Sequence, residues 1–418
     1  MAVKVKKIPI EYLQTMQKRK TTSGYSPSFV LAFLSMLFAC LHEFTQNIFS
    51  EVFSSFNYTF TVVSIMAIII YQLYILLSFR YYKYKYVLII GLLGIAYFAL
   101  LYLFLFSGLT RALYLCSMIL NLLVYKRYKL SNSEKNKLYW LFILLVIIMI
   151  INGSVKGMVI DNKVNPNTSG LLLMLIFCMS IVRFRKSKKV LDFLIAVSSF
   201  GLQFLYQSRT ATVGCVAFLT LVILFCGGRK YCTTYFAAFI ILLISVISVV
   251  FAYWYAEILY QSVGRGNITI FGKDLFTGRQ YIWNLAFESI RKNFWFGVGS
   301  DFNEDLAAIQ NNSALLNAHN QSLGILTSFG VTTFVMFTLV FAYLTSRSCE
   351  TTDKCKRKVT FRLPIVFIVS ILIMNFAETN FFYSWGMVIM AAYCFICNNC
   401  EKIKKRRYLM LMERNAER

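Results

Sequence analysis

Long apolar runs recur along the chain from Ser26 to Asn398 and predict membrane-spanning helices. The runs are roughly 17–25 residues long, which is the length an α-helix needs to cross a bilayer. A transmembrane β-barrel would instead show short segments of alternating polarity. We predict twelve spans, at residues 27–42, 58–79, 86–106, 108–125, 138–153, 168–182, 190–206, 210–227, 232–254, 320–345, 361–377 and 380–398. The pattern therefore predicts an all-α polytopic membrane protein.

The composition agrees with this class. Hydrophobic residues make up 58% of the 418 residues, whereas soluble domains contain about 45–50% apolar residues. The first 20 residues are basic, and no A-x-A-like cleavage site follows the first apolar run. We therefore expect the first run to be retained as a span and not removed as a signal peptide.

Basic residues alternate between successive connections, and this alternation predicts the orientation. Of the 43 lysines and arginines, 34 lie in the two tails and in the connections after even-numbered spans. The remaining connections hold ten acids and nine basic residues, which are Arg111, Lys156, Lys163, Arg209, Arg265, Lys273, Arg279, Arg291 and Lys292. Because basic connections stay in the cytoplasm, both termini are predicted to be cytoplasmic. The net charge of +25 then reflects topology and contact with anionic lipid headgroups, and it does not indicate nucleic-acid binding.

The predicted spans divide the chain into five parts. Residues 1–26 form a basic cytoplasmic tail, 27–254 hold spans one to nine, 255–319 form a large extracytoplasmic loop, 320–398 hold the last three spans, and 399–418 form a second basic tail. The loop contains the only long polar segment, so aqueous chemistry is expected there. None of the eleven cysteines lies in the most polar stretch of the chain, Thr277–Asn320. The run Cys394-x2-Cys397-x2-Cys400 has no histidine nearby, and ordinary apolar packing is the favoured interpretation over a metal site.

An amphipathic helix is predicted at the start of this polar segment. Thr277-x-x-Gln280 has the form of a capping box. The apolar residues that follow recur at helical spacing over 278–292 and are Ile282, Leu285, Ala286 and Ile290. Arg279 lies in the first turn, where unpaired N–H groups attract anions and a planar guanidinium suits phosphate. The alternative is a surface arginine paired with Asp274 or with a lipid headgroup.

Four further positions in the outward connections carry candidate chemistry. Arg209 and Glu378 are charges beside the membrane core, where charge is costly and often functional, and Glu378 could pair with an arginine. His319 lies at the mouth of the tenth span, and a neutral imidazole can accept a proton from a hydroxyl. A structural role remains open for His319 and for the other histidine, His42. Gly297-x-Gly299 permits a tight turn, for which a simple helix-to-helix connection is the favoured interpretation.

Together these residues resemble the O-antigen polymerase and ligase family of bacterial membrane glycosyltransferases. The resemblance covers about 165–335 and rests on Asn165-Pro166-Asn167, Ser208-Arg209, Gly278-Arg279, Trp283, Gly297-x-Gly299, Phe302, His319-Asn320, Leu323 and Gly330. The sequence departs from the family at Asn293-Phe294, where Asn-Pro is usual, and this leaves the geometry of the loop open.

The resemblance implies a GT-C-like fold with about twelve spans and one large outer loop. It also implies transfer of sugar chains from undecaprenyl pyrophosphate to an acceptor hydroxyl, with no metal or other cofactor. Arg209 and Arg279 would bind the pyrophosphate, and His319 would activate the hydroxyl. Asn320, Gly297, Gly299 and Glu378 complete the candidate site as supporting residues.

The leading hypothesis is a polysaccharide polymerase in the plasma membrane of a bacterium. It would join undecaprenyl-pyrophosphate-linked repeat units into capsule, exopolysaccharide or O-antigen, with a flippase and a chain-length regulator as candidate partners. A ligase of the same family differs only in its acceptor. A polyprenyl-phosphate sugar transferase would instead use Glu43 or Glu51. A transporter would show charges near the membrane midplane and matching broken spans in two halves, and neither pattern is evident.

Overall fold

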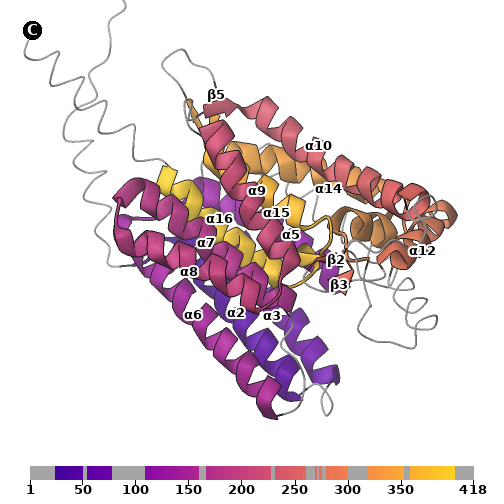
Figure 1. The fold of residues 1–418 in the computed structure, drawn as a ribbon. Helices are drawn as coiled ribbons and strands as arrows, with labels where there is room; N and C mark the ends of the chain where they lie inside the picture. The colour runs from indigo at the N-terminus through magenta and orange to yellow at the C-terminus, as the bar shows by residue number, and fades with distance from the viewer. Residues whose placement is uncertain are drawn as a thin grey trace, which may run out of the picture.

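The fold was analysed in a computed structural model of the chain. The structure describes residues 24–49, 54–77, 109–159, 166–226, 231–259, 269–270, 273–274, 279–299, 318–352 and 358–400. These residues form a bundle of long helices (Figure 1). The helices are α2 (Pro27–Phe49), α3 (Ser54–Leu77), α5 (Leu109–Arg127), α6 (Asn132–Val159), α7 (Pro166–Ser187), α8 (Val190–Leu205), α9 (Arg209–Cys226), α10 (Thr234–Tyr253), α12 (Arg279–Lys292), α14 (Gln321–Ser348), α15 (Arg362–Met374) and α16 (Ser384–Cys400).

Short elements connect these helices. A π-helical turn, η2 (Trp254–Leu259), prolongs α10, and a 3-10 turn, η4 (Asn380–Phe382), precedes α16. The strands β1 (Tyr231–Thr233), β4 (Glu350–Thr352) and β5 (Lys358–Phe361) form an antiparallel sheet in the order β1-β5-β4. A second antiparallel pair joins β2 (Thr269–Ile270) to β3 (Lys273–Asp274).

The apolar helices agree with an all-α membrane protein. Within the described part of the chain, six helices are long and apolar enough to cross a membrane: Tyr58–Leu77, Leu109–Arg127, Asn167–Ser187, Arg209–Cys226, Thr234–Glu257 and Gln321–Ser348. Four shorter apolar helices accompany them: Pro27–His42, Val190–Leu205, Arg362–Met374 and Ser384–Cys400. The predicted span at 86–106 lies outside the described residues, and each of the others overlaps a described helix. The total of twelve spans and the GT-C-like topology remain predictions.

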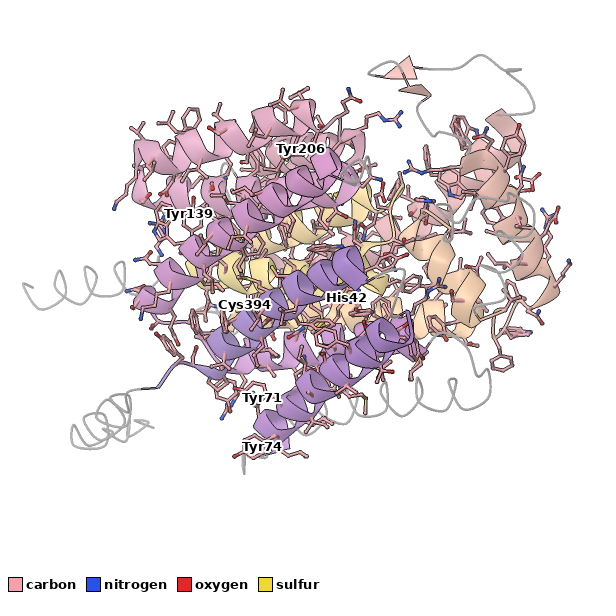
Figure 2. All side chains as sticks on the ribbon, turned by 90° about the horizontal axis from the view of Figure 1, so that it is seen from below. His42, Tyr71, Tyr74, Tyr139, Tyr206 and Cys394 are labelled. Carbon is pink, nitrogen blue, oxygen red and sulfur yellow. The ribbon has the colours of Figure 1, made fainter. Side chains whose placement is uncertain are left out.

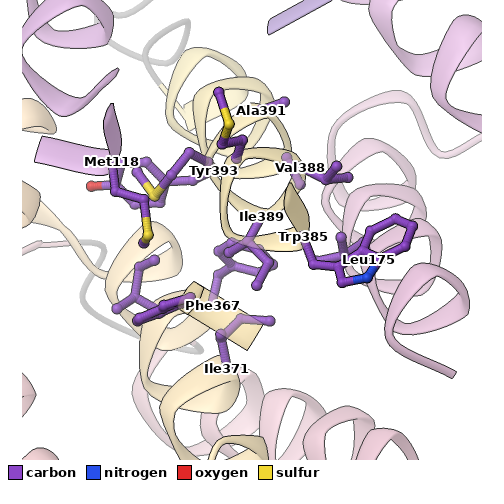
Figure 3. Packing of buried hydrophobic residues seen from close by; sticks show 14 of the residues in the cluster. Met118, Leu175, Phe367, Ile371, Trp385, Val388, Ile389, Ala391 and Tyr393 are labelled. Atoms are coloured by element: carbon purple, nitrogen blue, oxygen red, sulfur yellow. The ribbon is translucent and has the colours of Figure 1, made fainter. Parts of the chain in front are cut away.

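Helix α16 lies at the centre of the bundle. Its residues Met387, Ile389 and Met390 are completely buried, and Figure 3 shows Ile389 near side chains of α5, α7 and α15. A helix that is apolar on all sides and buried on all sides is expected in the middle of a membrane bundle. By contrast, α10 exposes Phe239, Val246 and Val250 along one face, as expected of a helix that contacts lipid.

The two ends of the bundle differ in character. One end of the bundle contains the first residues of α5, α7, α9 and α14 and the last residues of α15. We call it the His319 end. Helices α5 and α7 carry basic residues in their last turns, at the opposite end. There Asp192 of α8 pairs with Arg183 at 2.9 Å and accepts a hydrogen bond from Ser187 at 2.7 Å. The charge alternation of the sequence therefore corresponds to two distinct ends of the folded bundle.

Candidate active site

Arg209, Arg279, His319 and Glu378 gather at the His319 end. The Nη2 of Arg279 lies 3.1 Å from the Oε1 of Glu378, in the connection between α15 and α16. Both residues are buried, with 9% and 8% of their surface exposed. Arg209 interacts electrostatically with both members of this pair, and Arg279 interacts electrostatically with His319. The fold thus brings together four candidates from regions far apart in the sequence.

Helix α12 positions Arg279. It confirms the amphipathic helix predicted over 278–292, and it lies beside α10 and α14 (Figure 1). Its apolar face buries Ile282, Trp283 and Ala286 completely, so the helix lies over the bundle. The surface role considered for Arg279 is therefore wrong, because Arg279 is buried and paired with Glu378. Thr277 of the predicted capping box lies outside the described residues.

The backbone at His319 is held in an unusual conformation. Its φ is +44°, a left-handed value that is uncommon outside glycine. On one side, the indole of Trp283 donates a hydrogen bond to the carbonyl of Ala318 at 2.8 Å. On the other side, Asn320 caps α14 by accepting from the backbone N–H of Leu323 at 2.9 Å. These neighbours fix where the imidazole lies.

Asn320 also joins three parts of the bundle. Its amide donates to the carbonyls of Ser248 at 3.2 Å and Phe376 at 3.0 Å, and its oxygen accepts from the Ser248 hydroxyl at 3.2 Å. The side chain is completely buried. The supporting role predicted for Asn320 therefore has a physical basis, because it ties α10 and the α15–α16 connection to the start of α14.

Burial shifts the protonation equilibria of the site. It raises the pKa of Glu378 from 4.5 to about 7, against the opposing charges of Arg279 and Arg209. Burial, and then the charge of Arg279, lowers the pKa of His319 from 6.5 to about 3. Burial also lowers the pKa of Arg279, although Glu378 opposes this. At neutral pH the imidazole is therefore neutral and both of its nitrogens can take part in hydrogen bonding.

The Gly297-x-Gly299 turn is more than the simple connection that we predicted. It docks into a break in α14 at Gly330, whose φ is +73°. Backbone N–H groups of Val298 and Gly299 donate to the carbonyls of Thr327 and Ser328 at 2.8 and 3.1 Å. In return, Val331 donates to the carbonyl of Phe294 at 3.0 Å.

Glycine is required on both sides of this joint. Gly297 has a φ of +76°, and a Cβ there would lie 2.6 Å from the backbone nitrogens of Phe329 and Gly330. At Gly330, a Cβ would lie 2.3 Å from the carbonyl oxygen of Trp295. Gly299 also has a positive φ, of +65°. The glycines therefore anchor the loop that follows α12 to the membrane helix that carries His319 at its start.

The other candidates lie elsewhere or outside the described residues. His42, near the end of α2 (Figure 2), lies 3.0 Å from the Thr61 hydroxyl through Nδ1 and stacks on Phe38. The side chain of Glu43 and the whole of Glu51 are outside the described residues. Cys397 is buried, and its sulfur lies 2.7 Å from that of Cys349. Across the described residues, no three His, Cys, Asp or Glu side chains gather closely enough to hold a metal ion.

The fold and the site define a helical membrane protein with a buried, arginine-rich polar cluster at one end of its bundle. Residues 193–338 match a family model described as O-antigen ligase. The match covers about a third of the chain and is consistent with the resemblance to the O-antigen polymerase and ligase family. Comparison with curated proteins and with solved structures gave no match.

The matched segment contains most of the candidate site. Arg209, Arg279, His319 and the Gly297-x-Gly299 turn all lie within 193–338, whereas Glu378 lies beyond it. The match supports a glycosyltransferase-like enzyme of the O-antigen ligase type.

Proposed function

We propose that the protein polymerises undecaprenyl-pyrophosphate-linked oligosaccharide units into a capsular polysaccharide, exopolysaccharide or O-antigen. The observation that carries this proposal is the convergence of Arg209, Arg279, Glu378 and His319 at one end of the bundle. Two guanidinium groups beside a neutral imidazole suit a reaction in which a pyrophosphate leaves and a hydroxyl loses its proton.

The arginines provide the binding site for the donor's pyrophosphate. Arg209 is the first residue of α9 and Arg279 is the first residue of α12. The unpaired N–H groups and partial positive charge of each helix N-terminus add to the guanidinium charge. Because two arginines neutralise the leaving group, the proposed reaction needs no metal ion.

His319 acts as the base in this scheme. The acceptor oxygen forms a bond to the anomeric carbon of the donor, while the bond from that carbon to the pyrophosphate oxygen breaks and leaves its electron pair on the pyrophosphate. The hydroxyl proton moves to the imidazole. A bound pyrophosphate offsets the positive charge of Arg279, which otherwise lowers the pKa of His319, so the donor itself raises the basicity of His319.

The proposed setting is the plasma membrane of a bacterium. The His319 end faces outward and both termini are cytoplasmic, in keeping with the positive-inside rule. A flippase would supply lipid-linked units to that face, and a chain-length regulator would be a further partner. The alternative within the family is a ligase, which would transfer the finished glycan to another acceptor and would use the same donor site.

The test is polymer synthesis in a host strain that lacks its own copy of the gene. We expect His319→Gln to abolish polymer, because glutamine cannot accept the proton. His42→Gln is the matched control, because it changes the other histidine of the chain, and it should retain polymer of normal length. Unchanged polymer in the His319 variant would rule out the proposed base. Loss of polymer in Glu43→Gln or Glu51→Gln, with His319→Gln active, would favour the sugar transferase alternative.

A further inference from the structure

Arg111 is a charged residue that the proposed reaction does not use. It lies in the first turn of α5 at the His319 end. Its Nη1 donates to the hydroxyl of Ser328 on α14 at 2.8 Å. Its guanidinium carbon lies 5.3 Å from the centre of the Phe382 ring. Both partners are uncharged.

Three other buried or half-buried arginines of the described residues pair with an acid, and Arg362 donates to two backbone carbonyls. Arg279 pairs with Glu378, Arg183 with Asp192, and Arg347 with Glu350. Within the described residues, no carboxylate lies at ion-pair distance from Arg111. An arginine near the membrane core is costly and usually indicates a functional site, and an aromatic ring and one hydroxyl compensate only part of its charge. The described residues around Arg111 therefore supply no negative charge to balance it.

A second polar group beside Arg111 is also unsatisfied. Tyr114 lies one turn further along α5 and is only 3% exposed. Its hydroxyl has no hydrogen-bond partner within the described residues, although buried hydroxyl groups normally have one. Both Arg111 and Tyr114 interact electrostatically with Tyr383, which is 39% exposed. This cluster therefore combines a cation and a hydroxyl donor, and it adjoins a side chain that reaches the surface.

The cluster is separate from the donor site but close to it. Phe382, against which Arg111 packs, and Glu378, which pairs with Arg279, lie four residues apart in the connection between α15 and α16. A fully extended chain of four residues spans at most about 14 Å, which is the upper limit for the distance between these two residues along the backbone. Phe382 and Thr379, the residue after Glu378, both lie against α14, since a Cβ on Gly324 would be 2.9 Å from the Phe382 ring and 3.5 Å from the Thr379 methyl group.

We propose that Arg111, Tyr114 and Ser328 form a second phosphate subsite, which holds the pyrophosphate of the lipid-linked acceptor. This inference rests on the proposed function. A polymerase binds two lipid-linked pyrophosphates at once, and Arg209 with Arg279 accommodates only the donor's. A ligase whose acceptor carries no pyrophosphate needs no second subsite. The oligosaccharide unit of the acceptor bridges the distance between this subsite and His319.

The first experiment measures binding and requires no transfer activity. The full-length protein, in nanodiscs of phosphatidylcholine, is titrated with undecaprenyl pyrophosphate. With Arg209→Gln and Arg279→Gln both present, only the second subsite remains, and saturable binding should persist. Adding Arg111→Gln should weaken this binding at least about tenfold, the scale of one charge-assisted contact. Adding Arg291→Gln, which removes a 62% exposed arginine, should not.

Two results of the titration would overturn the subsite. Binding in the double variant that Arg111→Gln does not change would show that Arg111 holds no phosphate. Displacement of the probe by an equal concentration of phosphatidylglycerol would identify the subsite as one for ordinary lipid headgroups, and the assignment to the acceptor would be wrong.

The second experiment tests the role in transfer. A long lipid-linked glycan serves as the donor at fixed concentration, and a labelled single unit serves as the acceptor. We expect Arg111→Gln to raise the acceptor KM about tenfold with kcat within about twofold, and Arg111→Lys to restore part of the loss. An unchanged acceptor KM would contradict the proposal. If the wild-type protein transfers nothing, the proposed function fails, but the binding titration still decides whether the subsite exists.

Discussion

Glu378 neutralises the arginine that the donor needs. It is buried, pairs with Arg279 and interacts with Arg209, so it balances part of their charge when no substrate is present. A pyrophosphate that approaches Arg279 competes with this carboxylate. Protonation of Glu378 removes the competition, because a neutral carboxyl group holds the guanidinium less strongly.

This competition predicts how donor binding depends on pH. The pKa of Glu378 is raised from 4.5 to about 7, so the carboxyl group takes up a proton as the pH falls through that value. We expect the donor KM to fall as the pH is lowered from about 8 to about 6, because Arg279 becomes available. Steady-state kinetics across this range would measure it. Glu378→Gln should remove most of the dependence, and an identical slope in that variant would contradict the role of Glu378.

Trp283 is predicted to be a positioning residue. Its indole N–H holds the Ala318 carbonyl at 2.8 Å, next to the left-handed His319. Trp283→Phe keeps an aromatic ring but loses this hydrogen bond. We expect kcat to fall about tenfold with the donor KM little changed, because the base is displaced while the arginines remain in place. Trp295→Phe, at a 61% exposed side chain, is the control. Equal losses in both variants would show a general effect of replacing tryptophan.

At the scale of elements, the joint between the Gly297-x-Gly299 turn and α14 holds the site together. Reciprocal backbone hydrogen bonds link residues 294–299 to 327–332. The joint lies between α12, which begins with Arg279, and the helix that follows His319. Its rigidity therefore fixes the separation of the phosphate-binding arginine from the base.

Gly297→Ala and Gly330→Ala should each destabilise the protein strongly. Both positions have positive φ, which costs an alanine about 1–2 kcal/mol, and both would bring a Cβ within 2.6 Å of backbone atoms. Thermal unfolding in detergent, followed by tryptophan fluorescence, should show a lower transition temperature for each. Gly201→Ala in α8 is the matched control, because nothing lies within 4 Å of its added Cβ. Equal transition temperatures in all three variants would contradict the requirement for glycine at the joint.

The sequence predicted the elements better than the contacts between them. The spacing of Ile282, Ala286 and Ile290 was enough to place α12, because a 3.6-residue period depends only on local sequence. An ion pair between Glu378 and an arginine was also anticipated, because isolated charges beside a membrane core need partners. The charge of Arg111 was noted only as part of the topology.

The joint and the contacts across it were not predictable in the same way. The hydrogen bond from Val298 to Thr327 joins two backbone groups, so the side-chain identities at these positions do not predict it. The glycines were the local signals, namely the Gly297-x-Gly299 turn and Gly330 within an apolar run. The contacts from Trp283 to Ala318 and from Arg111 to Ser328 join residues 35 and 217 positions apart. Such contacts depend on how whole helices pack, which periodicity does not specify.

At the scale of the whole molecule, the two ends of the bundle should face opposite sides of the membrane. Basic last turns of α5 and α7 lie opposite the His319 end, and such residues stay in the cytoplasm. A fluorescent protein fused to the C-terminus should therefore fluoresce in cells. Arg291→Cys, at a 62% exposed side chain outside the joint, should react with an impermeant thiol label from outside. Labelling only after membrane disruption would reverse the proposed orientation.

We propose that the cluster at the His319 end transfers glycan from a lipid-linked pyrophosphate donor to a lipid-linked acceptor. The most direct test is to reconstitute the purified protein in liposomes with a lipid-linked oligosaccharide from its own host and to separate the products on a gel. We expect a ladder spaced by one repeat unit that disappears in His319→Ala and in Arg279→Ala. A ladder that persists in both variants would contradict the proposed site. Single-step transfer that appears only when a different acceptor is supplied would identify a ligase and contradict polymerisation.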